Sequence, residues 1–142
     1  MRSEELFTIT LRALRGQMKP VHESVLAQRI SSNRYRLICS PAMFVELTAD
    51  DEIELLEDTF RVIAHGGNSA VRIAIPKAHK QEQVQSAILP SIHAIGGWFD
   101  GAADVGDQMI FVFTLPSTVT SEMQGTLRQL IRDGFPSSVC IS

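Results

Sequence analysis

Histidine and cysteine are the side chains of this chain that could bind a metal ion or act as a base or nucleophile. They are His22, His65, His79 and His93, with Cys39 and Cys140. No HxxxH or CxxC spacing, which would bring two ligands to one metal ion, occurs. His79 and His93 lie near the two ends of one predicted helix, and a rise of about 1.5 Å per residue separates them by roughly 21 Å. We therefore predict no metal site and no cofactor.

Patterns for nucleophilic catalysis are also absent from the sequence. There is no GxSxG elbow, and Cys39 precedes Ser40-Pro41 without a neighbouring base. The glycine-rich segment 65–69 leads into a predicted strand, whereas a phosphate-binding loop opens a helix and uses its dipole. These observations predict that the protein is not an enzyme.

The overall composition predicts a folded protein with a real core. Of 142 residues, 44% are hydrophobic and 20% are charged. The net charge of -3, with only 13 basic residues, argues against nucleic-acid binding. No apolar run approaches the roughly 20 residues of a membrane span, and the start of the chain lacks the apolar region of a secretory signal. We expect a cytoplasmic protein that does not bind membranes.

The second half of the chain has a regular sequence pattern, which predicts the helices and strands that would position a site in it. Helical periodicity covers 80–95 and 119–133, and apolar strand patterns cover 69–76, 98–105, 109–115 and 137–141. The order β-α-β-β-α-β is typical of ferredoxin-like domains. The apolar stripes predicted to face the sheet are Val84, Ala87, Ile88, Ser91, Ile92 and Ile95 in the first helix, and Val119, Met123, Leu127, Leu130 and Ile131 in the second. We expect Gly96-Gly97 to end the first helix and Ser117 or Thr118 to cap the second.

The first half has strand patterns only. They cover 6–14, 21–30, 34–38, 44–47, 52–56 and 60–64, with short turns between them. This arrangement predicts a small β barrel or half-barrel. The glycine-rich joint at 65–68 separates the halves. The predicted fold class is α+β, with a small β domain over 1–66 and a ferredoxin-like domain over 67–142.

An acidic run is the strongest indication of a binding surface. Six acids lie within nine residues, with no base between them: Asp50, Asp51, Glu52, Glu54, Glu57 and Asp58. Such a run is either the solvated rim of a hairpin or a patch that meets a basic surface on another protein. We expect the side chains of Asp51, Glu52 and Glu54 to point outward, away from Ile53 and Leu55. We predict that the run contacts a protein partner.

A second candidate contact is the aromatic pair Trp98-Phe99, which follows Gly96-Gly97 and includes the single tryptophan. An amphipathic ring at such a position is either part of the core or an anchor for a partner. We include both residues in the predicted partner-binding site.

Short motifs between Arg34 and Ile75 resemble a known bacterial family. The motifs YRL (35–37), an acidic strand (51–57), FRVI (60–63) and GNSAVRI (67–73) occur in the family's order. That family is described only as a domain of unknown function, and the resemblance implies a small β half followed by a ferredoxin-like half. Where the family is expected to have Gly-His-Ser-Thr, this chain has Gly67-Asn68-Ser69-Ala70. An activity that required that histidine would be missing here.

These observations predict a non-enzymatic binding protein. By analogy with other small acidic proteins, its most concrete form is an immunity protein that neutralises a toxin, for example a nuclease, through an acidic surface. The alternative is a small-molecule-binding regulatory module of the ferredoxin-like class. Its ligand would lie at the Gly66-Gly67 or Gly96-Gly97 loop.

Overall fold

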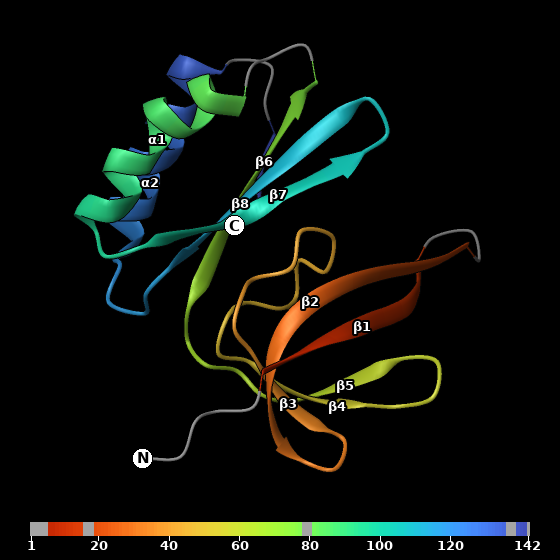
Figure 1. The fold of residues 1–142 in the computed structure, drawn as a ribbon. Coiled ribbons are helices and arrows are strands. Elements are labelled where there is room, and N and C mark those ends of the chain that lie inside the picture. Colours follow the sequence, from red (N-terminus) through yellow and green to blue (C-terminus); the bar gives the residue numbers. More distant parts are fainter. Residues whose placement is uncertain (1–5, 16–18, 78–80, 136–138, 142) are drawn as a thin grey trace. The chain divides into compact units, whose positions relative to one another are not determined.

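The computed structural model describes residues 6–15, 19–77, 81–135 and 139–141. The chain divides into two compact units, Met1–Gly67 and Asn68–Ser142. In their described parts, unit 1 has strands and no helix, whereas unit 2 has strands and two helices (Figure 1). The protein is therefore α+β, as predicted.

Unit 1 is one antiparallel sheet whose strands follow the order of the chain. The strands are β1 (Leu6–Arg15), β2 (Lys19–Ser31), β3 (Arg34–Leu37), β4 (Glu52–Leu55) and β5 (Phe60–Ala64). Each strand pairs only with its neighbours in sequence, and within the described residues no ladder joins β5 to β1. The described part of the sheet is therefore open, which rules out the closed barrel but not the half-barrel of the prediction.

Alternation along the strands sets the two faces of this sheet. The inner face buries a core made of Ile9, Leu11, Val25, Ala27, Leu37, Phe44, Leu47 and Ile53. On β3, Leu37 is buried and Tyr35 packs against the core, whereas Arg34 is exposed. Tyr35 and Leu37 therefore share the inner face of β3.

The connection between β3 and β4 differs from the prediction. Residues 44–47 do not form a strand, since the Leu47 N–H donates to the Phe44 carbonyl at 3.0 Å and closes a turn. Both side chains are nevertheless buried. The connection is held by side chains: Glu23 accepts the N–H groups of Ala42 and Met43 at 2.7 and 2.9 Å. The apolar residues that suggested a strand therefore serve a packed irregular segment.

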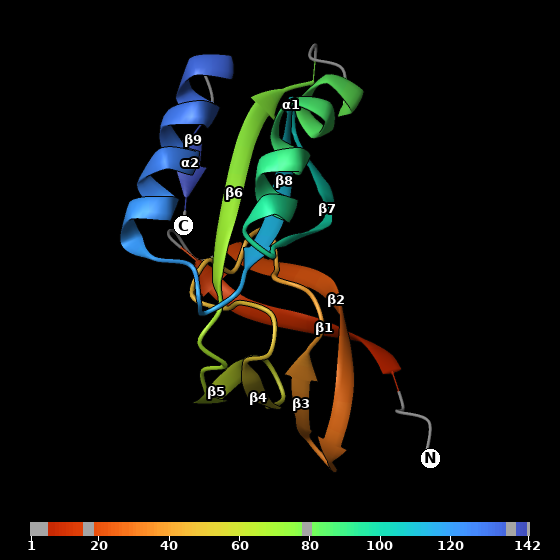
Figure 2. The ribbon, with the colours of Figure 1, turned by 90° about the vertical axis from the view of Figure 1, so that its left-hand side faces the viewer.

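Unit 2 is a four-stranded antiparallel sheet with two helices. Its elements are β6 (Ser69–Pro76), α1 (Gln81–Ala94), β7 (Trp98–Val105), β8 (Gln108–Leu115), α2 (Ser121–Gly134) and β9 (Val139–Ile141). The strand order across the sheet is β7-β8-β6-β9. Figures 1 and 2 show α1 and α2 side by side on one face of this sheet. The predicted succession of strands and helices is confirmed.

The core of unit 2 lies between the helices and this face of the sheet. Val84, Ile88 and Ile92 of α1 and Leu127 and Ile131 of α2 pack on alternate residues of β6 and β8. Ala87 and Leu130, which were predicted to face the sheet, are exposed instead.

The ends of the helices are only partly as predicted. Gly96 adopts a left-handed φ of 84° after α1, as expected. Gly97 lies so close to β8 that a Cβ atom there would be 2.6 Å from the Thr114 carbonyl oxygen. The cap of α2 is Thr120, whose side chain accepts the Met123 N–H at 3.1 Å, so the prediction of Ser117 or Thr118 is wrong.

Candidate functional site

Asp51, in the middle of the acidic run, is buried. Its side chain is 1% exposed. Oδ1 accepts the Gly66 N–H at 2.8 Å, and Oδ2 accepts the Thr48 N–H at 2.9 Å and lies 3.2 Å from Nδ1 of His65. The expectation that Asp51 points outward is wrong, because its carboxylate joins two backbone segments of unit 1.

The two glutamates of β4 point outward, but each forms an ion pair with a neighbouring strand. Arg36 on β3 lies 2.9 Å from Glu52, and Arg61 on β5 lies 2.5 Å from Glu54. The register places Arg36 opposite Glu52 and Arg61 opposite Glu54. The run is unbroken by bases in sequence, but the fold inserts a base on each side of β4. These two carboxylates therefore present little net negative charge.

The turn between β4 and β5 retains the acidic character. Leu56, Glu57, Asp58 and Thr59 are all exposed, and the Leu56 N–H donates to the Thr59 carbonyl at 2.9 Å. Within the described part of the chain, no cation forms an ion pair with Glu57 or Asp58. Leu56 is 47% exposed beside them. We call residues 56–59 the acidic turn.

Asp50, the first residue of the run, lies at the other end of β4 from the acidic turn. It is exposed, has a positive φ of 73°, and its N–H donates to the Leu37 carbonyl at 2.8 Å. Gly66 packs directly against it, since a Cβ atom at Gly66 would be 2.6 Å from Cβ of Asp50. The Gly66-Gly67 loop is thus used for close packing.

The two aromatic residues at the start of β7 have different surroundings. Phe99 packs against the core of unit 2, and its ring centroid lies 5.3 Å from that of Phe113. Trp98 is exposed, and its indole Nε1 donates to Asp100 at 2.8 Å. Phe99 is therefore part of the core. The ring of Trp98 is accessible to a partner, and its hydrogen bond to Asp100 fixes its orientation.

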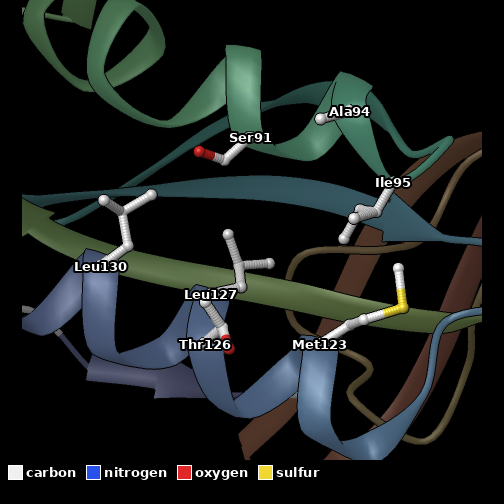
Figure 3. A pocket seen from close by; sticks show the side chains of 7 residues that line it. All are labelled: Ser91, Ala94, Ile95, Met123, Thr126, Leu127 and Leu130. Atoms are coloured by element: carbon white, nitrogen blue, oxygen red, sulfur yellow. The ribbon is translucent and has the colours of Figure 1, made fainter.

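A groove between α1 and α2 was not predicted from the sequence. It has a volume of about 320 Å³ and is lined by Ser91, Ala94, Ile95, Met123, Thr126, Leu127 and Leu130. Figure 3 shows that these side chains come from α1, from the residue that follows it and from α2. The hollow exists because the α1 side presents the small Ser91 and Ala94 opposite Leu127 and Leu130. The sequence does contain an indication of this groove, since the small, polar Ser91 interrupts the apolar stripe of α1.

Three of the four histidines lie among the described residues, each on a different segment of the chain. His22 and His93 are exposed at separate elements, His65 contacts Asp51, and His79 lies outside the described residues. In the described ranges, no three histidine, cysteine or acidic side chains come together where they could hold a metal ion.

The described helices are also too short or too polar to cross a membrane.

A comparison with known protein families shows to which family this chain belongs. The family model "Domain of unknown function (DUF4265)" matches residues 23–137. The chain belongs to the DUF4265 family. This match confirms the predicted resemblance to a domain of unknown function. The matched region includes β3 to β6, which contain the motifs that suggested the resemblance.

The fold of this DUF4265 member also occurs in a solved structure. A hypothetical protein from Neisseria gonorrhoeae, described as a novel crystal structure, is similar with a TM-score of 0.59 and 13% identity. The similarity covers 95% of this chain and 92% of that protein. No curated protein shows significant similarity to the chain. At this level of identity, the comparison supports the fold alone.

Proposed function

We propose that this DUF4265 protein is a non-enzymatic bacterial binding protein, most concretely an immunity protein that neutralises a toxin. The observation that carries the proposal is the acidic turn. It combines two carboxylates, which are exposed and form no ion pair with a described cation, and an exposed leucine beside them. Charges that attract a partner from solution and an apolar side chain that can be buried on contact are the two elements of a protein interface.

The proposed partner surface is an apolar pocket with lysine or arginine side chains at its rim. Such a surface would accept Leu56 while its cations meet Glu57 and Asp58. The positively charged cleft of a nuclease toxin is one surface of this kind, because it must attract phosphates. The proposed contact differs from the sequence prediction, since Asp51, Glu52 and Glu54 have partners within unit 1.

We also propose a ferredoxin-like architecture for unit 2. Support comes from its strand order, which reads 4-1-3-2 when β6, β7, β8 and β9 are counted as the first to fourth strands. The succession β-α-β-β-α-β and the position of both helices on one face support the same assignment.

The test of the binding proposal uses wild-type protein and the Glu57→Lys/Asp58→Lys variant as paired baits in cells of the native organism. A true partner should be captured by the wild type and lost with the variant. With the purified partner, we expect the variant's association rate to fall about tenfold at low salt, because steering by opposite charges is lost. Stopped-flow or surface-based kinetics over a salt series would measure it.

The matched control is Glu82→Lys/Asp107→Lys, which makes the same change of net charge at exposed residues of unit 2. It should associate with the partner nearly as fast as the wild type. If both variants slow association equally, only net charge matters. If neither does, the acidic turn is a solvated turn without a binding role.

The groove between α1 and α2 favours a second candidate function, the small-molecule-binding module. Its volume is at the lower end of the range for ligand sites, and its walls are apolar apart from the hydroxyls of Ser91 and Thr126. This chemistry suits a small, mostly apolar ligand with one hydrogen-bonding group. The site differs from the two glycine loops proposed from the sequence, which serve close packing and the end of α1.

A thermal-shift screen of small apolar compounds tests this candidate. A compound present at 100 times its Kd should stabilise the protein by about 2.7 kcal/mol. The Ser91→Leu variant, which places a larger side chain in the groove, should abolish the shift, whereas Ser86→Leu on exposed α1 surface should keep it. A shift that persists in Ser91→Leu would place the ligand elsewhere.

A further inference from the structure

The Thr126 hydroxyl, in the wall of the groove between α1 and α2, can serve a ligand only as an acceptor. It lines the groove together with the apolar side chains of both helices. Its hydrogen is donated to the Glu122 carbonyl at 3.1 Å, so its oxygen has only lone pairs left to offer. A ligand group that reaches Thr126 must therefore be a hydrogen-bond donor.

Two acidic side chains lie on the same face of α2 as Thr126. Glu122 is four residues before it and Asp133 is seven residues after it, and residues at these spacings lie above one another on a helix. Both side chains are exposed. The amide of Gln129 donates to Oδ1 of Asp133 at 2.8 Å, which keeps that carboxylate on this face. Carboxylates can only accept hydrogen bonds, so this side of the groove presents acceptors and negative charge.

The basic side chains of α2 lie on its other side. Arg128 and Arg132 each come two positions after a residue that lines the groove, which is a rotation of about 200° around the helix. On α1, Glu82 and His93 are about half a turn away from Ser91, which faces the groove. Among the described charged side chains of the two helices, those beside the groove are therefore negative.

The size of the groove favours a small ligand over a protein segment. Seven residues line it, and its volume is about 320 Å³. A stable protein interface uses about 20–30 residues on each side, whereas pockets for small molecules begin at about 300 Å³. The apolar walls would surround an alkyl chain, and the acidic face of α2 would contact its polar end.

We propose that the ligand of this groove is an aliphatic amine, with its alkyl chain between the helices and its ammonium group beside Glu122, Thr126 or Asp133. An ammonium group has three N–H donors, a positive charge and no acceptor, so it complements these oxygens. A carboxylate on the same chain would place acceptors against acceptors and negative charge against negative charge. This inference rests on the small-molecule function proposed for the groove, and it does not involve the acidic turn.

Three compounds with the same alkyl chain test the inference: octylamine, octanol and octanoate. Their polar ends are positive, neutral and negative. Isothermal titration calorimetry at low salt should show that octylamine binds at least about tenfold more tightly than octanoate, with octanol between them. The difference should shrink at high salt, because the charges are screened. The Ser91→Leu variant, which fills the groove, should abolish the binding of octylamine and octanol.

The Glu122→Gln/Asp133→Asn variant removes both charges with little change of shape. We expect its Kd for octylamine to rise about fivefold and its Kd for octanol to stay the same. The matched control is Glu82→Gln/Asp107→Asn, which makes the same change of net charge at exposed residues that do not line the groove. It should leave both Kd values unchanged, and circular dichroism verifies that each variant is folded.

Two results would overturn the amine inference alone: octanoate that binds in the groove as tightly as octylamine, or an octylamine Kd that is unaffected when both acids are removed. In either case, binding of octanol that Ser91→Leu abolishes would still support the small-molecule function. If no compound binds in a way that Ser91→Leu abolishes, the function proposed for the groove fails together with the inference. Where the double variant does not fold, the comparison of the three compounds on the wild type decides.

Discussion

The Leu127→Ala variant is expected to lower the free energy of unfolding by about 2–5 kcal/mol. Leu127 is 4% exposed and packs into the core between α2 and the sheet of unit 2. Shortening it removes buried methyl groups and leaves a cavity that the surrounding side chains fill only partly. Urea denaturation followed by circular dichroism would measure the change.

Leu130 offers a matched control on the same helix. It is 40% exposed and lies at the edge of the groove, so Leu130→Ala deletes the same atoms with little loss of buried surface. We expect a cost below about 1 kcal/mol. Similar losses at both positions would mean that α2 is rotated relative to the sheet.

The Asp51→Ala variant should be comparably damaging, with an expected loss of about 2–5 kcal/mol. The carboxylate accepts the N–H groups of Thr48 and Gly66 and contacts His65. Its removal leaves the partly buried N–H groups of Thr48 and Gly66 without this acceptor, at a cost of about 1–3 kcal/mol each. Asp51→Asn keeps one acceptor oxygen and should lose less. Thermal and urea unfolding of both variants would measure these differences.

Asp58→Ala is the control for this prediction, since it removes the same side chain from the exposed acidic turn. It should change the stability by no more than about 0.5 kcal/mol. If Asp51→Ala were equally mild, the hydrogen bonds of Asp51 would contribute little to unit 1. The expected contrast also explains why charge reversal at Asp51 is a poor test of partner binding.

The elements of unit 2 were largely predictable because each depends on local sequence. The apolar stripes of α1 and α2 recur every three or four residues, and Gly96-Gly97 ends α1 with a left-handed residue. At the edges of each apolar stripe, the sequence did not determine which residues are buried. Leu130 continues the pattern of Leu127, yet it lies beside a groove whose existence depends on small residues of another helix.

The β3–β4 connection could not be predicted because its stability is not local. Phe44 and Leu47 are apolar, which favoured a strand, but the segment is fixed by Glu23, about 20 residues earlier, and by Asp51. Within the acidic run, Asp51 resembles its neighbours in every property that the sequence displays. Only the approach of Gly66 and Thr48 distinguishes a buried acceptor from an exposed charge.

The bond between Asp51 and Gly66 limits how the joint between the two units can change in length. It fixes the chain up to Gly66, and β6 begins at Ser69, so only Gly67 and Asn68 separate an anchored end from the next strand. An inserted or deleted residue at this joint would therefore lie within two residues of either the Asp51 bond or the first strand of unit 2. The joint lies inside the matched region of the family, residues 23–137.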